Sequence, residues 1–425
     1  MKRSMKKTVF AALLLCAVIA AAGLAAAELG TAPDITQWAE IRLSKYNSQV
    51  KVLTDGDYKT DWRDERGAFA EFTLPADHPC HTLYILTSGD PEKLIVEEDR
   101  AGSWQRVPIE GERFNTHTIP LEGLTHFRVR VTRDKLRILE VRLFGQGKLP
   151  PDVVDYHHVA DKADLMVLAC HPDDDILWMG GLMPTYAGQL GMKVQLVYMT
   201  SRFHYRRCEA MDALWHSGVR QGPVFLGLPD SVDAKRDEAL AMWGDMDEAA
   251  LKIARQIRRF RPEVLVTQDV NGEYGHVQHC IMAAACTRAV KMAADPKNRR
   301  LRDLPAWEVK KYYMHLYHKN KVVLDMERPL SAFGGKTAFE VAKEAFLMHK
   351  SQQSGRVSVN VDGPYDMRRF GLAHTAVGPD ERDDRLFEHI EGLEKVEREF
   401  YDGQTYRPAA PEPTPRFRFS TRPPR

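Results

Sequence analysis

The sequence has neither an excess of one charge nor a concentrated basic segment. Its 425 residues include 60 Lys and Arg and 59 Asp and Glu, which give a formal net charge of +1 at pH 7. Nucleic-acid binding requires clustered Lys and Arg against the phosphates, so we expect no nucleic-acid partner. The balance suits a neutral, sugar-like substrate better.

Cysteine is scarce, and several catalytic signatures are missing. The cysteines after residue 27 show no CxxC spacing, which argues against a thiolate metal site, and they are far sparser than in a disulfide scaffold. We expect them to be buried free thiols. The sequence also lacks a Gly-x-Ser-x-Gly elbow, a P-loop and a His-Glu-x-x-His motif, so these three catalytic classes do not compete.

A run long enough to cross a membrane is also missing. Val9–Leu24 is apolar but short for a span, and polar sequence follows it. Basic residues precede this run and Ala25-Ala26-Ala27 follows it, which is the pattern of a signal peptide over residues 1–27. We therefore expect export to the periplasm or the extracellular space, with no transmembrane segment in the mature chain.

The length predicts two domains, and the first is expected to be all-β. Residues 36–147 contain short stretches rich in β-branched and aromatic residues, separated by turns such as Asp55-Gly56 and Ser88-Gly89. Regular strands without a convincing helix favour a β-sandwich or jelly roll. Strands are expected at residues 69–74, 82–87, 94–98, 116–119, 127–132 and 138–144.

After a linker at residues 147–151, strands alternate with helices over residues 155–400. This alternation predicts an α/β domain with a Rossmann-like parallel sheet and helices on both faces. Strands are expected at residues 165–170, 193–199, 224–228 and 264–267, and helices at 176–190, 205–217, 247–260 and 277–294. The Pro- and Arg-rich residues 408–425 are expected to form a disordered tail.

A cluster of polar residues follows the first strand of this second domain. The sequence there is Cys170-His171-Pro172-Asp173-Asp174-Asp175. Ligands of an open parallel sheet bind at the carboxyl ends of its strands, and crowded carboxylates need a cation to neutralise them. One imidazole and one carboxylate can bind a divalent metal, which leaves a second carboxylate to accept a proton from water. A solvated turn that caps the next helix is the alternative.

A second cluster follows the strand at residues 264–267. It contains Tyr274-Gly275-His276-Val277-Gln278-His279, with two histidines three residues apart where a helix begins. That spacing puts both rings on one face, and the positive end of the helix favours the neutral, metal-binding imidazole. Two surface histidines are the alternative. Because both clusters follow strand ends in the same alternating pattern, we favour one shared metal site.

The two clusters resemble the motifs of the PIG-L/LmbE-like family of metal-dependent N-deacetylases, Ala-His-Pro-Asp-Asp-Glu and Tyr-Gly-His-x-x-His. The resemblance spans residues 165–352. It implies Zn²⁺ as the cofactor, with Fe²⁺ as the alternative metal. The implied metal ligands are His171, Asp174 and His279.

The same resemblance implies the catalytic roles. Asp173 would be the general base that activates water. His276 would stabilise the oxyanion or protonate the leaving group, and Tyr274 would assist at the same carbonyl. Arg206, in an Arg-x-x-Glu helix start, and Asp230, in a Leu-Pro-Asp segment, would contact substrate hydroxyls; an exposed helix charge and a loop cap are the respective alternatives.

Two residues depart from the family pattern. Asp175 stands where the family usually has Glu, and the shorter side chain changes what the carboxylate can orient. Gln278 replaces an Asp that the family often has between its two histidines. An amide does not supply the negative charge that a carboxylate gives to a metal-binding His, so we expect an altered metal affinity or pH optimum.

Residues 36–147 resemble a discoidin, or coagulation-factor type C, domain. The matching features are Leu53-Thr54-Asp55-Gly56-Asp57, Trp62, Trp104 and residues 138–141. The resemblance implies carbohydrate binding, and a domain that only packs against its neighbour is the alternative. Trp62 and Trp104 are candidates for sugar stacking, although a core role is expected for large aromatics.

The sequence therefore predicts an exported zinc-dependent N-deacetylase that acts on the N-acetyl group of an amino-sugar glycan or glycoconjugate. A zinc amidase for a larger acyl or peptide-like amide is the alternative enzyme. A glycan-binding protein without activity is the alternative outside the enzymes, and the complete set of three ligands and a base argues against it.

Overall fold

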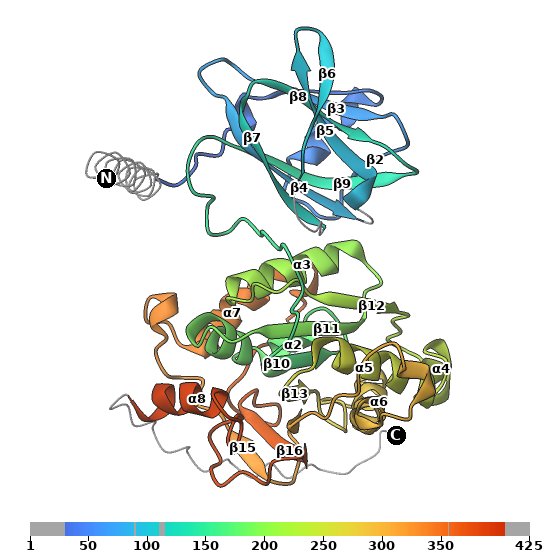
Figure 1. The fold of residues 1–425 in the computed structure, drawn as a ribbon, viewed down its shortest axis with the longest axis vertical. Coiled ribbons are helices and arrows are strands. Elements are labelled where there is room, and N and C mark those ends of the chain that lie inside the picture. The colour runs from blue at the N-terminus through green and yellow to red at the C-terminus, as the bar shows by residue number, and fades with distance from the viewer. Residues whose placement is uncertain (1–29, 89–90, 110–114, 356, 404–425) are drawn as a thin grey trace, which may run out of the picture. The chain divides into compact units, whose positions relative to one another are not determined.

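The computed structural model describes residues 30–88, 91–109, 115–355 and 357–403 (Figure 1). The chain divides into two compact units, residues 1–157 and 158–425. The expected signal peptide at residues 1–27 and the expected tail at residues 408–425 lie outside the described residues. Within the described ranges, no helix has both the length and the apolar character that crossing a membrane requires.

The first unit contains two antiparallel sheets that share one hydrophobic core. Phe72 and Phe127 of one sheet lie in the same buried cluster as Leu83 and Val141 of the other. Alternation along each strand sends these side chains inward and polar ones outward. The five-stranded sheet has the order β1 (Glu40–Leu43), β3 (Phe69–Thr73), β8 (His126–Val131), β5 (Leu94–Arg100), β6 (Ser103–Val107), and the four-stranded sheet the order β2 (Trp62–Asp64), β9 (Leu136–Phe144), β4 (Cys80–Ser88), β7 (Thr116–Leu124).

The two candidate aromatics of this unit have different surroundings. Trp62 is completely buried in the core. Trp104 is half-buried, and the Arg128 guanidinium lies 4.2 Å from the centre of its ring. Trp62 is therefore a core residue that does not reach a ligand, whereas Trp104 retains an exposed edge.

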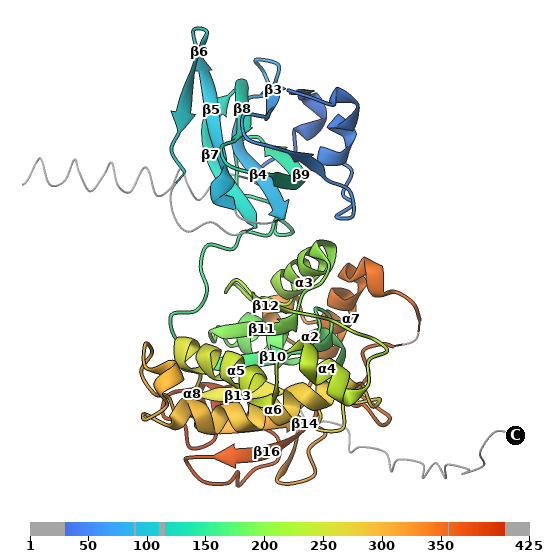
Figure 2. The same cartoon turned by 90° about the vertical axis from the view of Figure 1, so that its right-hand side faces the viewer.

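The second unit is an α/β domain built on a seven-stranded sheet (Figures 1 and 2). Five neighbouring strands run parallel, and the sixth strand in spatial order is antiparallel to both of its neighbours. The strand order is β12 (Val224–Leu228), β11 (Val194–Thr200), β10 (Leu165–Ala169), β13 (Val264–Thr267), β14 (Lys311–His315), β16 (Arg369–Thr375), β15 (Lys321–Val323).

The predicted parallel sheet is therefore found over five strands, and this edge departs from it. Only residues 316–320 connect β14 to β15, which is too short for the crossover that neighbouring parallel strands need. The chain returns later as β16, which fits between β14 and β15 and runs antiparallel to both.

Helices cover both faces of the sheet, and the side chains of β10 enter a separate core on each face. Leu165 and Val167 lie in one core, and Met166 and Leu168 lie in the other. The first core is covered by α2 (Asp174–Met179), α3 (His204–His216), α7 (Ala338–Met348) and α8 (Leu393–Asp402), and the second by α4 (Arg236–Met242), α5 (Met246–Phe260) and α6 (Val277–Ala294).

The helix expected over residues 176–190 is interrupted. Helix α2 ends at Met179, and a π-helical turn occupies Met183–Gln189. The intervening glycines lie against other elements: a Cβ atom on Gly181 would approach Met326 to 2.2 Å. The two glycines between the helical segments therefore lie where a larger residue would clash with its neighbours.

The order of the strands defines where a site is expected. From β10 the chain first adds β11 and β12 on one side, and then crosses to add β13 and β14 on the other side. The carboxyl ends of β10 and β13 therefore flank the point where the winding direction reverses, which is the usual ligand site of an open α/β sheet.

Candidate metal centre

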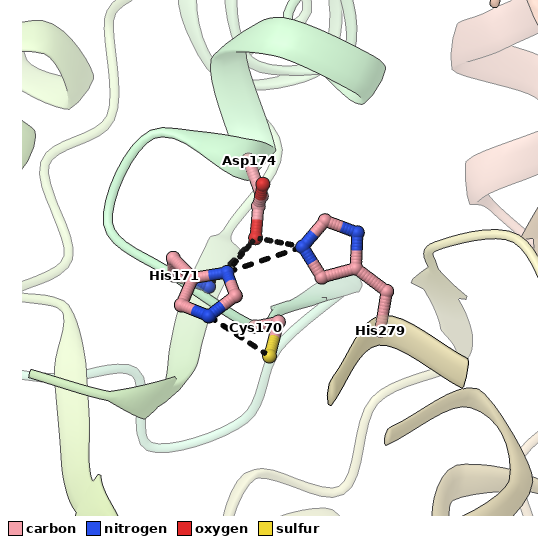
Figure 3. Close-up of side chains that lie close together, drawn as sticks. All are labelled: Cys170, His171, Asp174 and His279. Atoms are coloured by element: carbon pink, nitrogen blue, oxygen red, sulfur yellow. Dashed lines mark hydrogen bonds and ion pairs between the residues drawn. The ribbon is translucent and has the colours of Figure 1, made fainter. Parts of the chain in front are cut away.

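Three donor atoms converge at this point of the sheet (Figure 3). His171 and Asp174 lie where β10 leads into α2, and His279 lies in the first turn of α6. Asp174 Oδ2 is 2.9 Å from His171 Nδ1 and 3.1 Å from His279 Nε2, and the two nitrogens are 3.1 Å apart. All three side chains are buried.

Polar partners lie on the far side of each ring. His279 Nδ1 is 2.8 Å from Glu273 Oε2, a carboxylate oxygen that can only accept, and 2.8 Å from Gln268 Nε2. His171 Nε2 is 3.3 Å from Gln278 Oε1 and 3.4 Å from Asp230 Oδ1, which are also acceptors. Neutral rings that donate to these acceptors would direct the lone pairs of His171 Nδ1 and His279 Nε2 at one another, as a bound cation requires.

Two lone pairs and a carboxylate oxygen facing one another fit a divalent cation. Metal bonds of about 2.0–2.1 Å place tetrahedral ligands roughly 3.3 Å apart, close to the separations observed here. The donor set of two imidazoles and one carboxylate is that of a catalytic zinc site, which keeps one position open. Burial by itself would lower the pKa of His279, but Asp174 and Glu273 raise it to about 10, so the surroundings favour a positive charge here.

Cys170 is a fourth member of the cluster. Its sulfur and the donor atoms of His171, Asp174 and His279 all lie within 4.8 Å of one another. The thiol is buried, and its sulfur is 3.8 Å from His171 Nε2, the ring nitrogen that faces away from the other two donors. A buried free thiol is what the sequence predicts for this cysteine.

Asp173 and Arg206 form a buried ion pair beside the three donors. Arg206 Nη2 donates to Asp173 Oδ1 at 2.6 Å, and Arg206 Nη1 lies 3.8 Å from Asp230. Burial raises the pKa of Asp173, Arg206 opposes this shift, and Asp174 adds to it. Arg206 thus contacts the expected base directly, a contact that its predicted role in binding hydroxyls did not include.

His276 and Tyr274 line the pocket beside the three donor residues. The His276 ring stacks on His279 with centroids 4.4 Å apart. Burial, together with His279 and His171, lowers the pKa of His276 to about 4, so it is neutral at pH 7. Tyr274 is half-exposed, and burial raises its pKa, so its hydroxyl keeps its proton.

Two residues that hold the ligands were not identified from the sequence. Glu273 is completely buried with φ = 51°, and burial would raise its pKa but its bonds to His279 and His315 lower it. Gln278 replaces an Asp, so a carboxylate beside the metal-binding histidines was expected to be missing; Glu273 supplies one at His279. The indole nitrogen of Trp178 donates to Asp174 Oδ1 at 3.1 Å. Its position four residues after Asp174 on a helix was an available signal.

Gln278 has a different task from the one expected. Besides facing His171, its Oε1 accepts from the backbone of Ser231 at 3.1 Å, and its Nε2 donates to the carbonyl of Pro229 at 3.0 Å. It thereby fixes the loop that carries Asp230. The other departure, Asp175, is completely buried. Burial raises its pKa to about 8, although the interaction with the Tyr198 hydroxyl lowers it.

The donors open into a pocket of about 750 Å³. Side chains from residues 352–354 and 357–365 form one wall, which the sequence did not predict. Glu209 on α3 anchors this wall by accepting from the Ser351 backbone at 2.8 Å and the Ser351 hydroxyl at 2.6 Å. Lining residues include Asp173, Arg206, Asp230, Tyr274 and His276 from the predicted set, and Leu177, Trp178, Val232, Gln352, Ser354, Val357, Ser358, Asn360 and Tyr365 beyond it.

Together, the fold and the site suit a metal-dependent hydrolase, because three donor atoms converge with a buried carboxylate beside them. The family model described as PIG-L, GlcNAc-PI de-N-acetylase, matches residues 166–290. The 1D-myo-inositol 2-acetamido-2-deoxy-alpha-D-glucopyranoside deacetylase of Geodermatophilus obscurus is 30% identical over 243 residues, covering 50% of this chain and 81% of that protein. Deacetylase 1 of the same description from Catenulispora acidiphila is 26% identical over 227 residues, covering 47% and 69%.

The chain therefore belongs to the PIG-L family and is a metal-dependent N-deacetylase. A solved structure, the N,N'-diacetylchitobiose deacetylase from Pyrococcus horikoshii, is 18% identical and covers 45% of this chain and 71% of that one. Its TM-score is 0.35, and the family assignment rests on the Geodermatophilus obscurus relative and the family model.

Proposed function

We propose that this protein is an exported, zinc-dependent N-deacetylase that hydrolyses the N-acetyl amide of an amino sugar in a glycan or glycoconjugate. One observation carries the proposal: two imidazole lone pairs and one carboxylate oxygen, all about 3 Å apart, converge beside the buried pair of Asp173 and Arg206. The relatives named above deacetylate a 2-acetamido-2-deoxy-glucopyranoside, which supports a GlcNAc-like substrate.

His171, Asp174 and His279 would hold the metal. A divalent metal bound there supplies the positive charge that polarises the substrate carbonyl and promotes ionisation of the attacking water. Asp173 accepts the proton of that water, because its raised pKa makes it a better base than an ordinary aspartate. Arg206 holds the Asp173 carboxylate in place and limits the rise in its pKa.

His276 faces the reacting carbonyl as a neutral imidazole and donates an N–H to the developing oxyanion. Tyr274 offers its hydroxyl to the same oxygen. Asp173 then returns its proton to the leaving amine, so the proton is conserved and the products are acetate and a free amine. The three residues with a proposed catalytic role, Asp173, His276 and Tyr274, all line the pocket.

The pocket lining contains polar and aromatic residues that suit a sugar and apolar residues that suit an acyl group. Arg206 and Asp230 offer a charged donor and an acceptor for sugar hydroxyls. Three aromatic residues line the pocket together: the centre of the Trp178 ring lies 5.9 Å from that of Tyr274 and 5.8 Å from that of Tyr365. This group suits stacking against a pyranose face. The apolar Leu177, Val232 and Val357 in the same 750 Å³ pocket favour a larger acyl group as the second candidate.

For the first unit we propose a discoidin-like jelly roll that binds carbohydrate. Two antiparallel sheets around one core are consistent with that topology. Trp104, with its exposed edge and the Arg128 guanidinium over its ring, is the candidate for sugar stacking.

The test of the proposed activity uses purified, zinc-loaded protein and GlcNAc-containing oligosaccharides. Wild type is expected to release acetate and a free amine, whereas Asp173→Ala binds one zinc and releases neither. If wild type holds zinc but releases no acetate, longer N-acyl sugars are tested next, and release from those alone identifies the larger-acyl amidase. Release by Asp173→Ala at the wild-type rate would contradict the assignment of the base.

A further inference from the structure

The carboxylate of Glu273 is shared between two histidines, only one of which faces the metal centre. It accepts from His279 Nδ1 at 2.8 Å and lies 3.1 Å from His315 Nδ1. It also accepts from the backbone of Asp269 at 2.9 Å and from Gln268 Nε2 at 3.4 Å. Four donors surround its two oxygens, so Glu273 acts only as an acceptor.

His315, the last residue of β14, is completely buried between two acceptors. On one side is Glu273 Oε1, and on the other, 3.1 Å from His315 Nε2, is the main-chain carbonyl oxygen of Asp366. The two ring nitrogens of His315 thus bridge the Glu273 carboxylate and the Asp366 carbonyl.

The Asp366 carbonyl connects this pair to the wall of the pocket. The Asp366 carboxylate is itself buried and accepts from Arg368 Nε at 3.0 Å and Arg369 Nε at 3.1 Å, which fixes the position of its backbone. The preceding residue is Tyr365, which lines the pocket and packs edge-on against Trp178 with the two ring centres 5.8 Å apart. His279, Glu273, His315 and Asp366 thus form one continuous chain from the donors to the wall.

We infer that His315 is a positioning residue: it keeps Glu273 against His279 and ties the metal centre to the pocket wall at Asp366. The inference rests on the proposed metal site but not on the identity of the substrate. His315 touches no donor atom directly and acts on His279 only through Glu273. Loss of such an outer partner typically weakens metal binding by about 10- to 100-fold.

The first measurement compares zinc dissociation constants, by chelator competition, in full-length wild type, His315→Gln, His315→Phe and His374→Gln. His374 lies on β16 beside β14, is partly exposed and belongs to no part of the site, so it controls for any change of a histidine in this sheet. His315→Phe keeps the ring but donates to nothing, and we expect its dissociation constant to rise about 10- to 100-fold. His315→Gln can still donate to Glu273 and is expected to rise less. Wild-type affinity in His315→Phe would overturn the inference.

The second measurement does not depend on whether the variants fold. In zinc-loaded wild type with ¹⁵N-labelled histidine, His315 Nδ1 is expected to carry the hydrogen that is donated to Glu273. A His315 Nδ1 without a hydrogen would overturn the inference. If both measurements give the expected result while no N-acyl sugar is hydrolysed, the proposed function fails and the role of His315 stands.

Discussion

At the scale of single residues, the two oxygens of Asp174 do different things. Oδ2 faces His171 and His279, and it also accepts from the His171 backbone N–H at 2.7 Å. Oδ1 accepts from the indole of Trp178, one helical turn along α2. The indole therefore fixes the rotation of the carboxylate and leaves one oxygen directed at the metal position.

Replacing Trp178 tests this arrangement. Trp178→Phe keeps an aromatic ring but removes the N–H, so Asp174 becomes free to rotate. We expect zinc affinity to fall about tenfold, by the usual effect of losing an outer hydrogen bond. The control is Trp307→Phe, which removes an indole bond to the Pro262 carbonyl, away from the donors, and should leave zinc affinity unchanged. Equal affinities in the two variants would contradict the role of Trp178.

The second prediction at this scale concerns His276. Its pKa is lowered to about 4 by burial and by the neighbouring His279 and His171, so it stays neutral from pH 5 upward. His276→Ala is expected to lower kcat by about 10²- to 10³-fold, as for loss of an oxyanion donor, and to leave the shape of the kcat–pH profile between pH 5 and 9 unchanged. A profile that loses its alkaline limb in the variant would instead identify His276 as a proton donor.

The predicted metal ligands and catalytic residues carried their signal in local motifs, whereas their supporting residues did not. His171, Asp174 and His279 follow strand ends that the sequence places at one edge of the sheet, and the structure brings their donor atoms together. Glu273 was invisible because its role depends on a left-handed backbone conformation, which a non-glycine residue rarely adopts.

At the scale of elements, one of the contacts that attach helix α8 to the sheet domain is a buried carboxylate. Glu397 is completely buried and accepts from the Tyr186 hydroxyl at 2.7 Å and from the backbones of Leu386 and Phe387 at 2.9 and 2.8 Å. Burial raises its pKa from 4.5 to about 7, although these three donors oppose the shift.

This shift predicts a pH dependence of stability. The native state holds the Glu397 proton more tightly than the unfolded chain, so the protonated form stabilises the fold fully below pH 4.5, and the contribution is lost as the pH rises to about 7. The loss amounts to about 3 kcal/mol. Urea unfolding of Glu397→Gln should show a free energy of unfolding that falls less than in wild type between pH 5 and 7.5. The same slope in both proteins would contradict this prediction.

Element boundaries were predictable where hydrophobic segments end at turns, as at β12, β13 and α6, whose observed bounds equal the expected ones. Strand β14 was not predicted, because it begins with Lys311 and ends with His315. Both are buried, and Lys311 is paired with Asp380 from a distant segment. Long-range partners of this kind leave no local pattern. In the first unit, β6 is a largely exposed edge strand and lacks a buried face.

At the scale of the whole molecule, the chain joins a unit of two antiparallel sheets to an α/β unit that has its own two cores. If the first unit binds glycan, its deletion up to Gly147 should lower the rate on a polymeric N-acetylated glycan more than the rate on a soluble sugar. Acetate release from both substrates measures this difference. Equal losses would indicate that the unit only supports the fold.

The strand order has a consequence for how the protein acquires its metal. His171 and His279 are 108 residues apart, and they meet only after β13 has paired with β10 on the side opposite β11. A chain that has formed β10, β11 and β12 alone offers one histidine and one aspartate, which is a weak site. Tight metal binding therefore requires a complete central sheet. The metal that is bound is then chosen from the ions around the folded domain, not from those around the growing chain.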